Sequence, residues 1–404
     1  MSLIVQKFGG SSVADAEKLF NVAGRITDTY KEGNSVVVVV SAQGDTTDDL
    51  IEKAAEINPN ASKREMDMLL STGEQITISL LAMAIEKLGF PVISLTGWQV
   101  GMKTDSHYSE ARIHKVDAER IRMELDKKRI VIVAGFQGIN KYDDITTLGR
   151  GGSDTTAVAL AAALKADLCE IYTDVDGVYT ADPRIVKDAR KLEEVSYDEM
   201  LELASLGANV LHNRSVEMAK KYNVNMSVRS SFSKVSGTKV MEVVKMEKML
   251  IKGVARDNDV ARIALVGLVD TPGIAFKVFS ALAKGNINVD IILQSIGRDN
   301  TKDISFTVNE KNLERALSIL NENKEALGFA EIKHTDNVSK VSIVGSGMVN
   351  NPGVAATMFE ALSEAGINIK MISTSEIKVM YLSTRKILNA QFRLFMINSL
   401  KICN

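Results

Sequence analysis

Two glycine-rich segments combine the residue types that hold phosphate and carboxylate groups. The segment KFGGSS at residues 7–12 places a lysine beside two glycines and two serines, and GRGGSDTT at residues 149–156 adds an arginine and an aspartate. Glycines let the backbone approach a ligand, amides at a helix start attract phosphate, and arginine grips a carboxylate with two hydrogen bonds. Neither segment has the Walker spacing of P-loop proteins. The alternative is that the first is only a tight strand–helix turn and the second only a flexible loop.

Further polar groups stand where predicted strands end and inside one predicted helix. SAQGDTT at residues 41–47 ends a run of valines, and TDVDGVYTADPR at residues 173–184 follows another apolar run. In the latter, Tyr179 could stack on a purine and Arg184 could meet a phosphate, whereas the acids lack the spacing of a calcium loop. Glu74 follows a glycine in a helix with a buried stripe. Judged alone, an exposed helical glutamate is its usual interpretation.

Composition limits the kinds of protein to which these segments can belong. The 404 residues include 49 lysines and arginines and 51 aspartates and glutamates, so the net charge is −2. No global positive field exists to attract a nucleic acid. Two cysteines, Cys169 and Cys403, are too few for a disulfide framework or a zinc site, and Cys169 is expected to fill core. Histidines 107, 114, 212 and 334 lack metal spacing and are expected to be surface or satisfied core residues, so Ser–His–Asp chemistry is not predicted.

Neither a signal peptide nor a membrane span is predicted. The chain reaches Lys7 and Gly9 after one short apolar run, and no apolar run approaches the roughly 18 residues that span a bilayer. We therefore expect a cytoplasmic protein without a membrane partner.

The elements that must position these segments alternate between strands and helices over about the first 230 residues. Apolar runs predict strands, and apolar residues at helical spacing predict the helices between them. Strands are expected at 3–5, 36–40, 91–93, 130–134 and 170–173, and helices at 19–30, 66–84 and 157–164. The five valines at 36–40 are typical of a strand buried on both faces. This alternation predicts a mostly parallel sheet with helices on both faces.

The rest of the chain contains an internal repeat with an offset of 80 residues. Pro272, Gly273 and Phe279 correspond to Pro352, Gly353 and Phe359, and six further pairs keep the same offset. So long an offset predicts two copies of a small domain rather than a solenoid. In each copy a strand (263–269 or 341–345) leads through a turn and a helix to a second strand (287–293 or 367–372). Thr271 and Asn351 suit a helix N-cap, and the proline after each suits the first helical position.

Together, these motifs resemble those of the aspartate kinase family, whose members begin the pathway to lysine, threonine and methionine. The resemblance covers about residues 1–380 and rests on KFGGSS, SAQGDTTD, STGEQ, GRGGSDTTA, TDVDGVYTADPR and the two repeats, which look like ACT domains. It implies an α/β fold with a three-layer αβα amino-acid kinase domain and a mostly parallel sheet at residues 1–247. Two α+β ACT domains of βαββαβ order would follow at 248–335 and 336–404.

The resemblance also implies substrates and the residues that bind them. The enzyme would transfer the γ-phosphoryl group of ATP, with Mg²⁺, to the β-carboxylate of L-aspartate and give 4-phospho-L-aspartate. The catalytic residues would be Lys7, which faces the transferred group, and Asp154, which orders the cations. The aspartate site would be formed by Thr47, Glu74 (at the α-amino group), Arg150 (at a carboxylate), Gly151, Gly152 and Ser153. The nucleotide site would be formed by Lys7, Gly9, Gly10, Ser11, Ser41, Thr173, Asp174, Tyr179, Asp182 and Arg184. A carboxylate is already a nucleophile at pH 7, so positioning and charge neutralisation would suffice.

For the repeats, the resemblance implies feedback inhibition by lysine, threonine or both, and pairing of ACT domains between chains in a homo-oligomer. Helix-start amides near Gly273 could accept the effector carboxylate, and Asp270 could receive its ammonium group. The expected effector residues are Asp270, Gly273, Ile274, Ala275, Gln294, Asn368 and Ile369.

The tail departs from the family pattern after about residue 380. It is basic and apolar, as a reading-frame change would produce, although Ile387, Phe392, Phe395 and Leu400 could still form the buried face of a helix. Two alternatives to aspartate kinase remain at this point. One is another kinase of the same fold, acting on a different carboxylate, a carbamate or a nucleotide. The other is a regulatory subunit that binds amino acids without catalysis.

Overall fold

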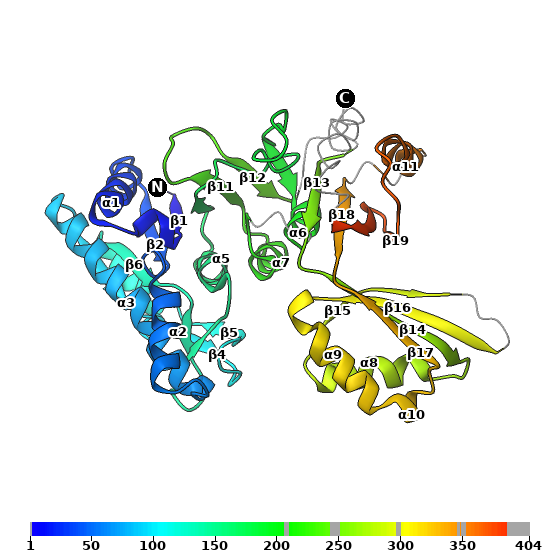
Figure 1. The fold of residues 1–404 in the computed structure, drawn as a ribbon. Helices are drawn as coiled ribbons and strands as arrows, with labels where there is room; N and C mark the ends of the chain where they lie inside the picture. The colour runs from blue at the N-terminus through cyan, green and yellow to red at the C-terminus, as the bar shows by residue number, and fades with distance from the viewer. Residues whose placement is uncertain are drawn as a thin grey trace. The chain divides into compact units, whose positions relative to one another are not determined.

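The computed structural model describes residues 2–205, 210–242, 251–295, 300–345, 348 and 353–385. The chain forms two compact units, each described here by itself (Figure 1). The N-terminal unit runs to Tyr179 and resumes at Lys191. The C-terminal unit contains the segment Thr180–Arg190 besides the C-terminal part of the chain.

An eight-stranded sheet forms the centre of the N-terminal unit. Its strand order is β10-β12-β11-β9-β1-β2-β6-β3. The strands are β1 (Leu3–Phe8), β2 (Ser35–Val40), β3 (Val92–Leu95), β6 (Ile130–Ala134), β9 (Leu168–Thr173), β10 (Glu194–Ser196), β11 (Met226–Ser230) and β12 (Thr238–Met241). Every neighbouring pair is parallel except β11 with β12. The valines of 36–40 are fully buried, as expected for a central strand covered on both sides.

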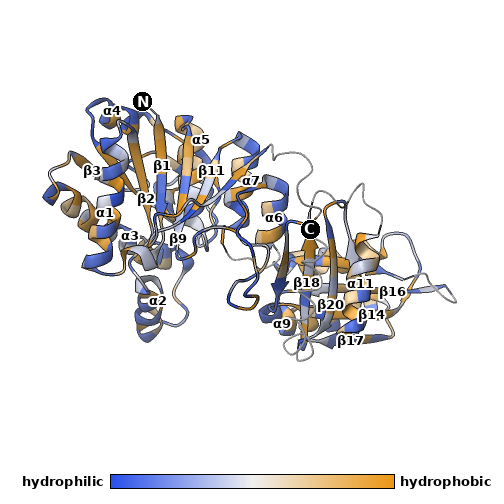
Figure 2. Cartoon of the chain, turned by 90° about the horizontal axis from the view of Figure 1, so that it is seen from above, coloured by the Kyte–Doolittle hydropathy of each residue, from blue (hydrophilic) through white to orange (hydrophobic). Residues whose placement is uncertain are grey.

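Helices cover both faces of this sheet. The helices of the unit are α1 (Ala16–Lys31), α2 (Thr46–Ile57), α3 (Lys63–Lys87), α4 (Glu119–Asp126), α5 (Gly152–Leu164), α6 (Tyr197–Ser205) and α7 (Asn213–Tyr222), with the 3-10 turn η1 (Gly10–Val13). Apolar side chains of α1 and α3 share one core with Val36, Val38 and Val40. Side chains alternate along a strand, so Val39 and its partner Lys7 face the opposite side, where α5 lies. In Figure 2 the hydrophobic colour gathers on the central strands, as this layering requires.

A smaller sheet adjoins the start of α5. Its order is β5-β4-β7-β8, with β4 (Met102–Thr104), β5 (Ile113–Val116), β7 (Gln137–Ile139) and β8 (Ile145–Thr147). Strand β8 ends at Thr147, two residues before the glycine-rich segment 149–156 begins. This sheet therefore sets where that segment begins.

The C-terminal unit contains two four-stranded antiparallel sheets. The first, in the order β15-β16-β14-β17, has β14 (Ala261–Val269), β15 (Val289–Gln294), β16 (Thr301–Val308) and β17 (Glu331–Thr335), with α8 (Ile274–Lys284), η2 (Glu310–Asn312), α9 (Leu313–Glu322) and α10 (Lys324–Leu327). The second, in the order β13-β18-β20-β19, has β13 (Gly253–Asp257), β18 (Val338–Val344), β19 (Met371–Thr374) and β20 (Lys378–Thr384), with α11 (Val354–Glu364). Strand β13 precedes the first repeat in sequence but pairs with β18 of the second. The expected domain boundaries stay predictions.

Several local expectations need correction. Helix α5 begins at Gly152 rather than at residue 157, so Ser153 and Asp154 lie in its first turn. The N-cap prediction for Thr271 is wrong, because α8 begins at Ile274 after Gly273, whose φ of +91° suits glycine. Helix α11 likewise begins after a left-handed Gly353, while Asn351 and Pro352 lie outside the described residues.

The atypical tail joins the second sheet at its start. Residues 380–384 belong to β20, which pairs in continuous register with β18 from Val338 to Val344. Arg385, the next residue, donates to Glu310 at 2.8 Å and to the carbonyl of Asn258 at 2.7 Å. The expected helix over Ile387 to Leu400, and Cys403, lie outside the described residues.

Among the described residues, α3 alone is long and apolar enough to cross a membrane by length and composition. More than half of its most apolar stretch is buried inside the unit, and its buried face carries Asp67 and Glu74. A core helix of a folded domain shows the same features.

Candidate active site

Lys7 and Asp154 meet at the carboxyl edge of the central sheet. Lys7 is the penultimate residue of β1, and Asp154 lies in the first turn of α5. Lys7 Nζ lies 2.7 Å from Asp154 Oδ1, and both side chains are nearly buried. Parallel α/β sheets bind ligands at this edge. The structure therefore brings together the two residues expected to be catalytic.

Glycines allow the neighbouring loops to touch beside this pair. A Cβ at Gly10 would lie only 2.6 Å from the carbonyl oxygen of Ala42, and the Gly44 amide donates to the Gly10 carbonyl at 3.0 Å. A Cβ at Gly73 of α3 would lie 2.8 Å from the Ala42 side chain. The Ser41 amide donates to the Phe8 carbonyl at 3.2 Å. The segments 7–12 and 41–47 and helix α3 thus form one continuous wall.

Glu74 stands on this wall as a carboxyl group with one free oxygen. The Ala42 amide donates to Oε1 at 3.1 Å, whereas Oε2 is buried and has no hydrogen-bond partner among the described residues. Burial raises the pKa of Glu74 to about 8, although the Ala42 hydrogen bond acts in the other direction. A buried carboxyl group without a cation suits a cationic ligand group. The interpretation of Glu74 as an exposed helical glutamate is wrong.

The Arg150 loop connects the small sheet to α5. Gly149 and Gly151 have φ values of +77° and +68°, the left-handed region in which glycine is unstrained. Arg150 between them is exposed, and no hydrogen bond or ion pair engages it in the described part of the chain. Ser153 follows in the first turn of α5, where a Cβ at Gly135 would approach its Oγ to 2.6 Å. The side chain of Arg150 is thus available for a ligand. A loop that was only flexible would not need an arginine there.

His212 was expected to be a surface or satisfied core residue, and that expectation is wrong. A Cβ at Gly151 would lie 2.3 Å from its ring, so the ring packs directly on the Arg150 loop. Its Nδ1 is buried without a partner in the described residues. Burial lowers the pKa of His212, and the charge of nearby Asp154 acts in the opposite direction. The sequence does not predict this contact, because His212 follows Gly151 by 61 residues.

Of the remaining residues expected at the site, some are close to Lys7 and others are tied to their own neighbours. A Cβ at Gly9 would lie 3.6 Å from Lys7 Nζ. Ser11 is exposed in η1, and Thr47 is half-buried in the first turn of α2. The hydroxyl of Thr173, at the end of β9, donates to Asp174 at 2.9 Å, and Tyr179 donates to Asp176 at 2.7 Å.

The expected nucleotide residues are divided between the two units. Thr173, Asp174 and Tyr179 belong to the N-terminal unit, whereas Asp182 and Arg184 lie on the segment Thr180–Arg190 of the C-terminal unit. Arg184 pairs with Asp182 at 2.9 Å. In the same segment Ala181 and Val186 are buried in the core formed with β18 and α11. The stretch predicted to bind ATP therefore continues along the chain into residues that are buried in the core of the second repeat.

The expected effector residues lie at strand and helix ends of the two repeats. Asp270 follows β14 and pairs with Lys302 of β16, so its carboxylate already has a cationic partner. Gly273, Ile274 and Ala275 form the start of α8, and Gln294 ends β15. Asn368, whose carbonyl accepts from Ser383 at 2.6 Å, and Ile369 precede β19.

Comparison with known proteins identifies this architecture. Residues 2–230 match the amino acid kinase family, and residues 263–323 and 341–386 match the ACT domain. The aspartokinase of Bacillus sp. (strain MGA3) is 54% identical over 380 residues, which cover 94% of this chain and 92% of that protein. The aspartokinase of Corynebacterium glutamicum is 52% identical over 399 residues, covering 97% and 95% of the two chains. The chain belongs to the aspartokinase family.

A solved structure agrees with this membership. E. coli aspartokinase III in complex with aspartate and ADP superposes with a TM-score of 0.83 at 25% identity, over 99% of both chains. The expected family and fold class are confirmed. As an aspartokinase, the chain is an ATP-dependent kinase that acts on a carboxyl group. The alternative of a non-catalytic regulatory subunit is wrong.

Proposed function

We propose that this aspartokinase transfers the γ-phosphoryl group of ATP to the β-carboxylate of L-aspartate at the carboxyl edge of its central sheet. The observation that carries this assignment is the juxtaposition of Lys7 with Asp154, on the same wall of loops as the buried free oxygen of Glu74. Glu74 would receive the α-ammonium group of aspartate, and Arg150 a carboxylate. Thr47, Gly151, Gly152 and Ser153 would complete the aspartate site.

The reaction would depend mainly on bringing two anions together. The aspartate carboxylate needs no general base, so the contribution of the protein is orientation and neutralisation of the charge on the γ-phosphoryl oxygens. Lys7 supplies a positive charge there, held in place by Asp154 at 2.7 Å. Gly9, Gly10, Ser11 and the start of α5 would direct backbone amides toward the phosphates. The other residues proposed for the nucleotide are Ser41, Thr173, Asp174, Tyr179, Asp182 and Arg184.

Mg²⁺ fits this site as a companion of ATP. The described residues contain no group of three or more His, Cys, Asp and Glu side chains that could hold a metal ion on their own. A magnesium ion usually keeps one or two carboxylates besides substrate phosphates and water, and Asp154 supplies such a carboxylate. Bound there, the ion would neutralise charge on the phosphate oxygens.

A substrate panel tests the assignment. ADP formation is expected with L-aspartate and ATP, and a drop of at least about 100-fold in kcat/KM is expected with L-glutamate, with succinate or with UMP, because each lacks the spacing or the ammonium group that Glu74 and Arg150 would meet. Faster turnover of any of these compounds than of aspartate would contradict the assignment.

Feedback inhibition by lysine, threonine or both is proposed for the ACT repeats. E. coli aspartokinase III has been solved in complex with lysine and aspartate, at 25% identity and a TM-score of 0.74 to this chain. In this chain Ala181 and Val186, which are near the proposed nucleotide residues Asp182 and Arg184 in sequence, are buried in the core of the second repeat. Pathway position, assembly into a homo-oligomer and a cytoplasmic location are proposals of the same kind.

Lys302 is expected to compete with the effector for Asp270. In this structure the ammonium group of Lys302 pairs with the carboxylate of Asp270, and an effector ammonium group would need the same carboxylate. Lys302→Met should therefore lower the concentration of lysine or threonine for half-inhibition by about 3–5-fold, as expected for loss of one partly exposed ion pair. Inhibition curves at fixed ATP and aspartate measure this effect. Lys333→Met, which removes the exposed pair with Glu331 in the same unit, is the control and should leave the curve unchanged. A higher half-inhibiting concentration in Lys302→Met would show that Lys302 itself binds the effector.

A further inference from the structure

Asp67 is a buried carboxylate that the proposed chemistry does not use. It lies on the buried face of α3, seven residues before Glu74, and is fully inaccessible to solvent. Its Oδ2 accepts from the amides of Ser109 and Thr147, both at 2.9 Å. Its Oδ1 accepts from the hydroxyl of Thr147 at 2.7 Å and from that of Ser109 at 3.3 Å. Four donors satisfy the carboxylate, so Asp67 has no remaining position for a ligand.

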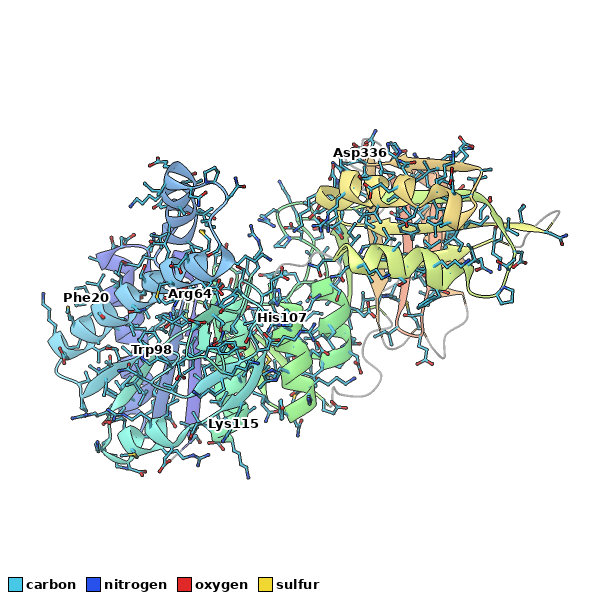
Figure 3. The ribbon with its side chains drawn as sticks, turned by 90° about the horizontal axis from the view of Figure 1, so that it is seen from below. Phe20, Arg64, Trp98, His107, Lys115 and Asp336 are labelled. Carbon is cyan, nitrogen blue, oxygen red and sulfur yellow. The ribbon has the colours of Figure 1, made fainter. Side chains whose placement is uncertain are left out.

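Arg214 holds the same region from another element. It lies in the first turn of α7 and is partly buried. One guanidinium nitrogen donates to the Leu148 carbonyl at 2.6 Å, and another donates to the Ala111 carbonyl at 2.9 Å. In Figure 3 the labelled Arg64 and His107 help to find the region, since they lie three residues before Asp67 and two residues before Ser109.

The backbone between β8 and the Arg150 loop is thereby fixed at every polar group. The Thr147 amide donates to Asp67, and its carbonyl accepts from the Ala111 amide at 2.9 Å. The Leu148 amide donates to the Phe136 carbonyl at 2.8 Å, and its carbonyl accepts from Arg214. Arg150 comes only two residues later, between two left-handed glycines.

The loop is fixed on its other side by α5. The Gly152 amide donates to the Gly149 carbonyl at 3.0 Å, and the Thr155 amide donates to the Gly151 carbonyl at 3.2 Å. The backbone of Arg150 is thus held on both sides, while its side chain stays exposed. Preorganised groups bind a ligand more tightly because less conformational freedom is lost on binding.

We propose that Asp67 and Arg214 are positioning residues that hold the Arg150 loop and thereby set the affinity for aspartate. Neither residue touches the substrate; both act through the backbone of Thr147 and Leu148. The inference rests on the proposed function in one respect, namely that Arg150 meets a carboxylate of aspartate.

The chemistry of the four donors predicts which substitutions matter. Asp67→Ala leaves the buried amide of Thr147 and the part-buried amide of Ser109 without a hydrogen-bond acceptor. Asp67→Asn keeps one oxygen for both amides and turns its NH₂ group toward the two hydroxyls, which can rotate to accept. Asp67→Ala should therefore raise the KM for aspartate by about 10–50-fold, and Asp67→Asn should restore it to within about 3-fold of wild type. Arg214→Met should act like Asp67→Ala.

The readouts separate positioning from a loss of stability. Under the proposal, the KM for ATP stays within about 2-fold in each variant that raises the KM for aspartate. Glu124→Ala is the matched control, because Glu124 is equally buried and pairs with Arg129 at 2.9 Å near the start of β6. It should lower the Tm without changing the KM for aspartate. A parallel rise of both KM values in Asp67→Ala, or a rise for aspartate in Glu124→Ala, would overturn the inference.

A double-mutant cycle with Arg150→Ala tests separately whether Asp67 acts through Arg150 and whether Arg150 binds aspartate. If Asp67 acts through Arg150, Asp67→Ala should have little further effect on the KM for aspartate in the Arg150→Ala background. Additive effects would refute the positioning role. An unchanged KM in Arg150→Ala alone would instead refute the proposed role of Arg150 in substrate binding. If Asp67→Ala does not fold, Arg214→Met combined with Arg150→Ala completes the same cycle.

Discussion

Replacing Lys7 by methionine is expected to lower kcat by roughly 10²–10³-fold while leaving a folded chain. The side chain supplies the positive charge that the γ-phosphoryl oxygens would meet, and removal of one such preorganised group typically costs this factor. Methionine keeps the length and the apolar stem, so β1 and its pairing with β2 and β9 should persist. The measurement is steady-state ADP formation at saturating aspartate and MgATP, together with a melting curve.

The control for Lys7 is another buried lysine that lies outside the proposed site. Lys340 of the C-terminal unit is 4% exposed, and its ammonium group lies 2.6 Å from Asp290 and 3.3 Å from Asp257. Lys340→Met therefore also leaves two carboxylates without their cation, a part-buried one at Asp257 and an exposed one at Asp290, and both variants should melt below wild type. Only Lys7→Met should lose turnover when effectors are absent. A kcat for Lys7→Met within tenfold of wild type would show that Lys7 does not neutralise the transferred group.

The sequence predicts features that depend on local residue patterns, and it does not predict contacts between residues far apart in the chain. The buried strands followed from runs of β-branched residues, and the valines of 36–40 are fully buried in β2. The convergence of Lys7 with Asp154 followed from motifs at strand ends of one parallel sheet. The sequence predicts too late a start for α5 because Gly152, Ser153 and Asp154 have weak intrinsic helix propensity, whereas in the structure they form its first turn.

Residues that act through distant partners were not predictable. Asp67 bonds Thr147 across 80 residues and Arg214 bonds Leu148 across 66, so no local spacing connects them. His212 contacts Gly151 in the same way. At Thr271 the sequence offered a good N-cap, but the left-handed Gly273 two residues later begins the helix instead. In that case a backbone conformation available to glycine decided where the helix starts.

Aspartate binding is expected to release close to one proton per molecule at pH 7. Because burial raises the pKa of Glu74 to about 8, this carboxyl group is mostly protonated in the free enzyme at pH 7. The α-ammonium group of aspartate would favour the ionised form, so binding would expel the proton. Calorimetric titration of aspartate in two buffers of different ionisation enthalpy measures the number released. If the pH dependence of the Tm described below confirms the raised pKa of Glu74, the absence of proton release in wild type would show that Glu74 does not meet an ammonium group.

The same coupling predicts the pH dependence of the KM for aspartate. Below pH 8 a proton competes with the substrate for Glu74, so the KM should fall about tenfold per pH unit as the pH rises from 6 toward 8. Glu74→Gln keeps an oxygen for the Ala42 amide but cannot ionise. Its KM should be raised by about 10²–10³-fold at pH 8, as for a broken buried charge pair, and should be independent of pH. Glu124→Gln, which removes a buried carboxylate paired within the chain, should keep the wild-type slope.

Without substrate, the contribution of Glu74 to the stability of the folded chain should decrease as the pH rises. Between its ordinary pKa of 4.5 and its folded pKa of about 8, the folded chain holds one more proton than the unfolded chain. The stability contributed by Glu74 is therefore complete below about pH 4.5 and is lost as the pH rises through 8. The Tm of Glu74→Gln relative to wild type should accordingly increase across this window. Saturating aspartate should reduce the difference, because the bound ammonium group would stabilise the ionised carboxylate of the wild type. A Tm difference that stays constant from pH 5 to pH 8.5 would refute the raised pKa of Glu74 and, with it, the proton release.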